Sequence, residues 1–274
     1  MRHTRHIGRG CTLRGAWIMA FAGAVALLVA APAARAGYVQ LTQTRSLDTG
    51  ASASFGTTAD DADSDHSEAL GSFDQSITST ASNGDFLPPN FYGGSGTGVA
   101  RQSAQLTPTS ISGSFIGDAQ ATTTSAASSS RANSTWSTTF RADQPTPFDL
   151  DGRMSAQDVS VVGFTGGNAA GSLTLSRHAD AGGPEVVLYS VALPPFPGGI
   201  PPTVDFSGVL EPGYVYSLAA TAMASRENQS LGHPRAVYGQ TITTVTFTLT
   251  AVPEPAAAGV LALVAALALR RRRA

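Results

Sequence analysis

The stretch that decides the fold is residues 204–224, VDFSGVLEPGYVYSLAATAMA. A period of two in apolar or small residues, on each side of Pro212-Gly213, is typical of β-strands that bury one face. Because Pro-Gly favours a tight turn, we expect two antiparallel strands joined at this point. The small residues near the end of the stretch would let two sheets pack closely. The alternating residues are Val204, Phe206, Gly208 and Leu210, then Tyr214, Tyr216, Leu218, Ala220, Ala222 and Ala224.

Weaker segments of the same kind continue outward through residues 37–251, and a strong one follows at Val245, Phe247, Leu249 and Ala251. About twelve short strands separated by turns predict an all-β fold, a single antiparallel β-sandwich of the jelly-roll kind. The expected turns are Asn83-Gly84, Asp151-Gly152, Gly166-Gly167-Asn168 and Gly182-Gly183-Pro184.

Loops are expected where the alternation fails. Residues 57–68 are acidic and polar with little to bury, which predicts a mobile loop. Residues 87–98 and 193–202 combine glycine and proline with aromatic side chains, and we expect loops there as well.

The N-terminal residues 1–36 have the pattern of a secretory signal peptide. Four arginines precede an apolar helix over residues 16–31, and Ala34-Arg35-Ala36 supplies the small-x-small cleavage pattern before Gly37. The single cysteine, Cys11, lies in this segment. We therefore expect the exported body, residues 37–251, to contain no disulfide.

The C-terminal residues 252–274 have three parts in a fixed order. Pro253-Glu254-Pro255 comes first, an apolar segment over 256–269 follows, and Arg270, Arg271, Arg272 and Arg273 come last. A helix of 14 residues rises about 21 Å, which is short for a membrane core of roughly 30 Å, but snorkelling arginines and local thinning can absorb the mismatch. Basic residues stay on the cytoplasmic side, so we expect a short transmembrane helix.

This order of motif, apolar helix and arginine block resembles the PEP-CTERM sorting signal of Gram-negative bacteria. The resemblance implies processing near Pro253-Glu254-Pro255 by an exosortase, a membrane transpeptidase. It also implies export through the inner membrane, a transient or stable anchor there, and a final place at the cell surface or in the extracellular matrix. Residues 204–214 are loosely similar to the Ser/Ala-rich β-domains that precede such signals. The signal is shared by proteins of many activities, so it names none.

The charge of the body excludes one class of partner. Of the 17 basic residues, nine lie in residues 1–36 and 270–273, which leaves 8 arginines; of the 19 carboxylates only Glu254 lies outside, which leaves 18, for a net charge of about −10. Nucleic acids and anionic membranes attract a basic face. We therefore expect no nucleic-acid partner.

Two groups of carboxylates are candidates for a metal site or a catalytic site. Asp61, Asp63 and Asp65 alternate as the first ligands of an EF-hand do, but the sixth position is His66 and the twelfth is Ser72, so a calcium site is a weak candidate beside a solvated acidic loop. Asp149 and Asp151 could share a face as in glycoside hydrolases. Their neighbours Phe148 and Leu150 have the core pattern, however, which would place the aspartates in water. We expect no catalytic residues, no metal and no cofactor.

Aromatic residues on the expected loops provide a binding hypothesis. Phe91 and Tyr92, or Phe196, could form a flat platform on which a sugar ring stacks. The alternative is that these rings close the open ends of the sandwich. Trp136 alternates with Thr138 and Phe140 and is expected in the core.

Together these patterns predict an exported, non-enzymatic structural protein of the cell surface or matrix. Its partners would be the secretion machinery, the exosortase and, before processing, the membrane. The alternative is a carbohydrate-binding module or adhesin that holds exopolysaccharide. A hydrolase has no supporting set of residues.

Overall fold

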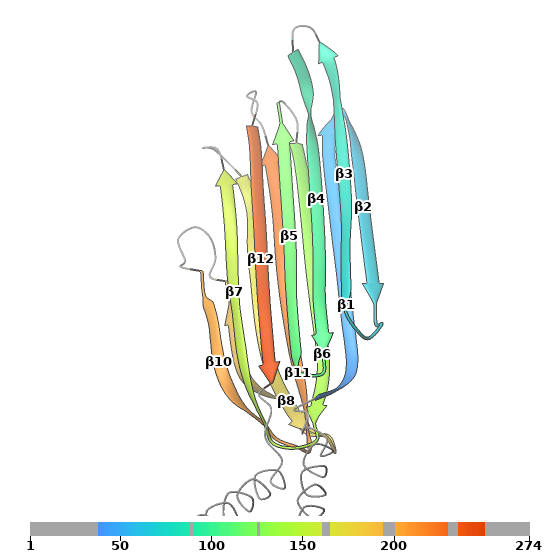
Figure 1. The fold of residues 1–274 in the computed structure, drawn as a ribbon. Helices are drawn as coiled ribbons and strands as arrows, with labels where there is room; N and C mark the ends of the chain where they lie inside the picture. The colour runs from blue at the N-terminus through green and yellow to red at the C-terminus, as the bar shows by residue number, and fades with distance from the viewer. Residues whose placement is uncertain are drawn as a thin grey trace, which may run out of the picture. The chain divides into compact units, whose positions relative to one another are not determined.

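Twelve antiparallel β-strands make up the described part of the chain (Figure 1). The computed structural model describes residues 38–87, 90–124, 127–160, 165–193, 201–229 and 235–249. The expected helices at 16–31 and 256–269 lie outside these ranges. The strands are β1 (Tyr38–Phe55), β2 (Thr57–Ser67), β3 (Phe73–Leu87), β4 (Asn90–Thr107), β5 (Ser110–Thr123), β6 (Ala127–Ala142), β7 (Thr146–Ser160), β8 (Thr165–Ala179), β9 (Val186–Ala192), β10 (Thr203–Leu210), β11 (Tyr214–Gln229) and β12 (Arg235–Leu249).

The strands form two six-stranded sheets packed face to face. The first sheet has the order β2-β1-β6-β11-β8-β9 and the second β10-β7-β12-β5-β4-β3. Successive strands from β5 to β8 alternate between the two sheets, a connection typical of jelly rolls. The prediction of an all-β antiparallel sandwich is confirmed.

The stretch that decided the fold forms β10 and β11, and its apolar positions face the interior. Val204, Leu210 and Leu218 are buried, as are the three alanines at 220, 222 and 224. Gly213 takes a positive φ of 83° in the turn. The turn does not form a hairpin, however, because β10 belongs to the second sheet and β11 to the first. Because β10 and β11 belong to sheets that face each other, the apolar faces of both strands point into the same core.

Two expected loops are strands. Residues 57–67 form β2, which pairs along its length with β1 after a turn at Gly56 (φ 71°). An edge strand needs only one neighbour, so its polar residues stay solvated while its backbone is paired. Residues 87–98 were also wrongly predicted, since β3 runs to Leu87 and β4 begins at Asn90.

The turn signals were right at one of four places. Gly182 and Gly183, with φ of 91° and 152°, form the turn between β8 and β9 as expected. Asn83-Gly84, Asp151-Gly152 and Gly166-Gly167-Asn168 instead lie inside β3, β7 and β8. Cross-strand pairing outweighs local turn preference at these positions.

Aromatic side chains fill the core at the end of the sandwich where β6 and β12 finish. Phe140 lies 5.2 Å from Phe247 and 5.9 Å from Tyr216 between ring centroids. Trp136, predicted to be in the core, is 2% exposed and stacks on Phe115 at 5.3 Å. Such rings contribute most of the apolar area that stabilises a core.

Toward the other end the interior side chains become small. The buried cluster there consists of Ala51, Ala53 and Ala81. On β4 the inward positions include Gly96 and Gly98, and a Cβ on either would overlap a backbone carbonyl of β6. The two sheets therefore touch backbone to backbone at this end, as the small inward residues of the sequence predicted.

Residues Ala36–Thr250 form one compact unit with its own core and hydrogen-bonded sheets. A unit of this kind can fold on its own. Among the described residues there is no helix long and apolar enough to cross a membrane.

Candidate functional site

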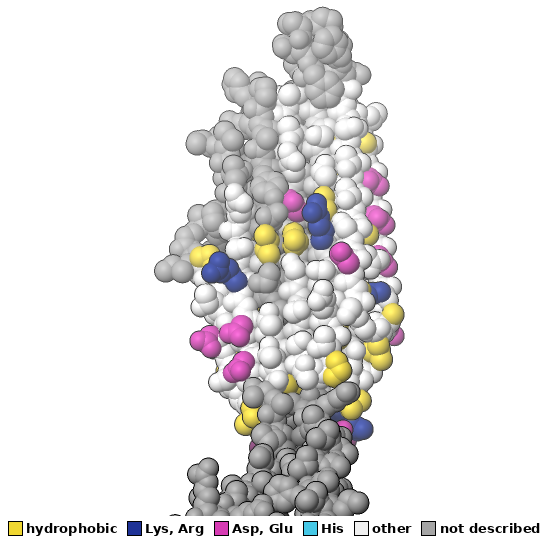
Figure 2. All heavy atoms as spheres, viewed as in Figure 1, with side chains coloured by type: hydrophobic (Ala, Val, Ile, Leu, Met, Phe, Trp, Pro, Cys, Tyr) yellow, Lys and Arg dark blue, Asp and Glu magenta, His cyan; other side chains and the backbone are white. Residues whose placement is uncertain are grey.

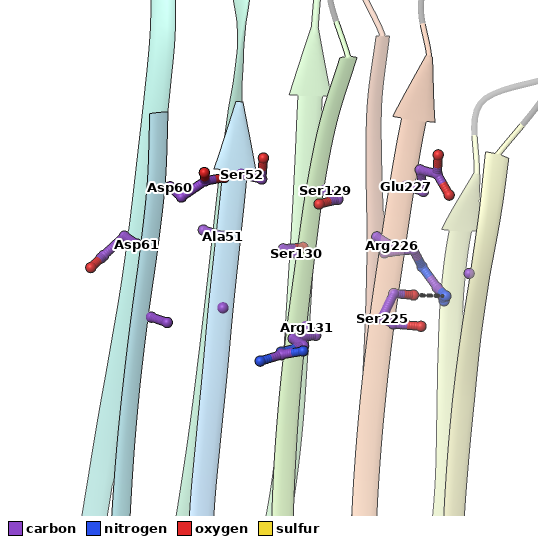
Figure 3. Close-up of a pocket in the computed structure, with 13 residues that line it drawn as sticks. Ala51, Ser52, Asp60, Asp61, Ser129, Ser130, Arg131, Ser225, Arg226 and Glu227 are labelled. Atoms are coloured by element: carbon purple, nitrogen blue, oxygen red, sulfur yellow. Dashed lines mark hydrogen bonds between the residues drawn. The ribbon is translucent and has the colours of Figure 1, made fainter. Parts of the chain in front are cut away.

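A groove of about 490 Å³ crosses the outer face of the first sheet and is the strongest candidate site in the described residues (Figure 3). Strand register builds it in rows. Asp60 of β2 pairs with Ser52 of β1, Ser52 pairs with Ser129 of β6, and Ser129 pairs with Glu227 of β11. Because these partners share one face of the sheet, their hydroxyls and carboxylates form a line across four strands.

The groove has two guanidinium groups: Nη1 of the buried Arg226 donates to the backbone oxygen of Ser225 at 2.7 Å, and the exposed one belongs to Arg131 in the next row. Gly50 pairs with Arg131, and Arg131 with Ser225. A Cβ at Gly50 would lie 3.0 Å from Nε of Arg131, so the glycine leaves room for the arginine to lie across the sheet. Nη2 of Arg131 is 3.9 Å from Oδ1 of Asp48, and both side chains are exposed. Such an exposed pair contributes little stability and leaves the guanidinium able to bind a ligand.

The lining chemistry suits a ligand with many hydroxyl groups. Serine hydroxyls both donate and accept hydrogen bonds, carboxylates accept them, and Arg131 donates them. No aromatic ring is among the described residues that line the groove, so a sugar there would be held by hydrogen bonds without stacking.

The three aspartates that form the weak calcium candidate lie on a strand and not in the acidic loop that the sequence predicted. Asp61, Asp63 and Asp65 lie on β2 opposite Ala51, Thr49 and Leu47. Oδ2 of Asp61 accepts a hydrogen bond of 2.7 Å from the backbone N–H of Thr80 on β3. An extended strand cannot wrap around an ion as an EF-hand loop does. Within the described ranges, no group of three or more His, Cys, Asp or Glu side chains is arranged to hold a metal.

Asp149 and Asp151 of β7 face water, as the alternation predicted. Phe148 and Leu150 are 3% and 0% exposed, whereas Asp149 and Asp151 lie on the solvent side. Asp149 pairs with Ser207 of β10 and Asp151 with Asp205. The register thus brings two carboxylates together on an open face, and a glycoside-hydrolase cleft is not formed there.

The glycan platform is only partly described. The backbone of Phe91 and Tyr92 belongs to β4, in register with Phe86 and Asp85 of β3, and not to a loop. Their side chains, and Phe196 entirely, lie outside what the structure describes. The same holds for the sorting motif (Pro253 to Pro255, Arg270 to Arg273) and for the cleavage residues Ala34, Ala36 and Gly37.

Two groups outside the groove have shifted pKa values. Burial raises the pKa of Tyr38, the first residue of β1, to about 12. The pKa of Arg177 is raised mainly by its hydrogen bond to Tyr216 and secondly by its hydrogen bond to Glu211. Nη1 of Arg177 lies 2.7 Å from Oε2 of Glu211. Both groups stabilise strand ends and play no part in the groove.

The groove is not evident from the sequence because its residues come from five strands, most of them distant from one another in the chain. The available signal was the polar half of the strand alternation, in which Gly50 and Ser52 mark outward positions of β1. That signal gives the face of a strand but not its neighbours.

Comparison with known proteins assigns the chain to no family. No family model matches the chain, and no curated protein matches it. Among solved structures, it is similar to a GH31 α-xylosidase from Xanthomonas citri at 8% identity and a TM-score of 0.17, over 70% of this chain and 30% of that one. It is also similar to T=1 particles derived from infectious bursal virus, at 11% identity and a TM-score of 0.18, over 86% of each chain. A third similar structure is that of the Gx strain of infectious bursal disease virus, at 12% identity and a TM-score of 0.19, over 81% of this chain and 68% of that one. The chain thus spans under a third of the xylosidase, and these likenesses carry no argument about function.

Proposed function

We propose that this chain is an exported, non-enzymatic structural protein of the bacterial cell surface or extracellular matrix. The observation that carries the proposal is the ordered pattern over residues 253–273, which resembles an exosortase sorting signal, together with the signal-peptide pattern over 1–36. The sandwich is compatible with this role. Its main core cluster is built of apolar side chains, and its sheets carry serine and threonine on their outer faces.

The outer faces support the proposal in physical terms. Cross-strand hydroxyl pairs include Thr42 with Thr139 at 2.6 Å and Ser172 with Thr221 at 2.8 Å between oxygens. The outer face of the second sheet, which Figure 2 shows, is also mostly neutral and polar, with scattered charged and apolar side chains. A hydrated surface rich in hydroxyl groups suits a protein that is packed at high density outside the cell.

The test compares the native protein with a variant in which Pro253, Glu254 and Pro255 are changed to alanine. Intact mass and cell fractionation should show the native protein without its C-terminal residues and outside the inner membrane, with the variant uncleaved and retained there. A control variant, Pro201→Ala with Pro202→Ala, removes two prolines of the body and should behave as the native protein. If native protein and variant both keep Arg270 to Arg273 in the inner membrane, the sorting proposal is wrong.

A second candidate function is binding of a neutral polysaccharide, which the groove of Ser52, Ser129 and Arg131 favours. A glycan array with the native body would detect it. Loss of binding in Arg131→Gln would place the ligand in the groove, whereas loss in Tyr92→Ala would place it at the aromatic residues of β4. No binding to any glycan would leave the structural role alone.

A further inference from the structure

The two lateral sides of the sandwich differ in how their edge strands are protected. Within the described residues, β2 and β9 are the edges of the first sheet, and β3 and β10 those of the second. A strand edge exposes unpaired backbone N–H and C=O groups and can pair with another chain unless something blocks it.

The side formed by β2 and β3 is closed by its own side chains. Asp61 of β2 accepts the backbone N–H of Thr80 on β3, and Nδ2 of Asn83 donates to the backbone oxygen of Thr57 at 2.6 Å. Asp63 and Asp65 share the side of β2 on which Asp61 reaches toward β3. Figure 2 shows carboxylates along this margin of the molecule. Inward charges on an edge strand are a known means of preventing pairing.

On the side formed by β9 and β10, strand β9 has no such side-chain protection, and its one irregularity is a register shift that leaves Leu188 without a partner on β8. The strand reads VVLYSVA and has no charged residue. Tyr189 stacks on Phe206 of β10 at 5.1 Å and so joins the two sheets, while Val186 and Val187 are 51% and 59% exposed. Strand β10, in contrast, carries the exposed Asp205 as its third residue.

A second copy of this chain is the partner that fits β9. The body has a net charge of about −10, so two copies can approach closely only where carboxylates are absent, and residues 186–192 contain none. Antiparallel pairing of a strand with itself about a two-fold axis is self-complementary and supplies main-chain hydrogen bonds.

We propose that the sandwich forms a two-fold dimer through edge-to-edge pairing of β9 with β9, and that the closed β2/β3 side stops assembly at the dimer. One pairing edge gives a closed dimer, whereas two would give an open filament. This inference does not rest on the sorting proposal.

Analytical ultracentrifugation of residues 37–251 over a wide concentration range tests the pairing. The native body should show a reversible monomer–dimer equilibrium, and Val187→Lys should lower the dimer fraction by at least about tenfold, because an edge lysine opposes pairing. Two matched controls are Val209→Lys on β10 and Met223→Lys in the middle of the first sheet, where valine and methionine are 51% and 46% exposed. A monomer at all concentrations, or loss of the dimer in a control but not in Val187→Lys, would overturn the proposal.

The limit to a dimer is tested by neutralising the closed side. Asp61, Asp63 and Asp65 changed together to serine should give species larger than a dimer. Changing Asp149, Asp151 and Asp205 to serine removes the same charge from the outer side of β7 and β10 and should leave the dimer unchanged. Equal assembly in the two variants would show that general repulsion, and not edge protection, sets the limit.

Single cysteines test the contact in the full-length chain. The only native cysteine, Cys11, is changed to serine in these variants, so one cysteine placed in turn at 186 to 192 reports on β9 alone. Disulfide-linked dimers should form at one or two positions next to the two-fold axis, where the two Cα atoms come within about 7 Å. Cross-links at no position, or equally at a cysteine replacing Ser76 on β3, would contradict the pairing.

Discussion

Gly98 lies where the backbones of the two sheets touch, and its missing side chain is a packing requirement. A Cβ there would overlap the carbonyl oxygen of Arg131 and lie 3.2 Å from that of Gly50. Because both partners are backbone atoms of central strands, neither can move aside without separating the sheets. The glycine therefore serves tertiary contact, not chain flexibility.

Gly98→Ala should lower the free energy of unfolding by about 3 kcal/mol or more, since overpacking against rigid backbone is poorly relieved. The matched control is Gly213→Ala, where φ is 83° but no atom lies within 4 Å of a built Cβ. That change should cost only about 1–2 kcal/mol of left-handed backbone strain. Urea unfolding of both variants decides the point, and equal losses would mean that the sheets are not in backbone contact.

At the scale of elements, β1 is fixed at its start by Tyr38. The hydroxyl of Tyr38 donates to the backbone oxygen of Ser110 at 3.4 Å, and its ring meets Phe140 edge-on at 5.3 Å. The backbone N–H of Tyr38 also donates to Pro108. The first residue of β1 is thereby tied to the turn between β4 and β5 in the other sheet.

Ionisation of Tyr38 should loosen this tie at alkaline pH. Burial raises the pKa from 10.0 to about 12, so the folded protein holds the proton more tightly than the unfolded chain. The resulting stability is fully present below pH 10 and is lost as the pH rises toward 12. Thermal unfolding from pH 8 to 11.5 should show a steeper fall for the native body than for Tyr38→Phe, which cannot ionise. Parallel curves would assign the alkaline loss to other groups.

The elements also show how far sequence alone could go. Strands with one apolar face, such as β10 and β11, were predictable because burial imposes a period of two on their side chains. Strand β2 was not predictable, because pairing with β1 satisfies its backbone hydrogen bonds and its aspartates face no core that would impose an alternating pattern. The glycines from Gly94 to Gly98 predicted a loop because glycine marks turns locally, whereas in the fold they permit a contact between strands distant in the chain.

The groove was harder to predict from sequence than the strands, because it too depends on which strands pair with one another. Ser52, Ser129 and Glu227 are ordinary outward residues in their own strands, and only sheet order makes them neighbours. No short motif records that order. A sequence pattern could show which residues face outward, but the groove depends on pairings over more than 70 positions, which only the fold supplies.

At the scale of the whole sandwich, apolar burial is unequal along the strands. One end holds the rings of Phe115, Trp136, Phe140 and Phe247, while the other holds alanine, glycine and serine. Each buried aromatic ring contributes roughly 2–3 kcal/mol, far more than an alanine methyl. The small-residue end should therefore open locally before the molecule unfolds as a whole.

Hydrogen exchange along β6 measures how local stability changes from the aromatic end to the small-residue end within one strand. The strand pairs with β1 and β11 over nearly its whole length, so its amides share the same sheet environment. Amides near Phe140 should exchange only through global unfolding, whereas those from Ser128 to Ala132 should exchange at least about tenfold faster through local opening. Phe140→Leu should speed exchange near residue 140 and leave Ser128 to Ala132 nearly unchanged, because the latter amides already open independently. Uniform protection along β6 would show instead that backbone contact at the glycine end stabilises the sheets as strongly as the aromatic core does.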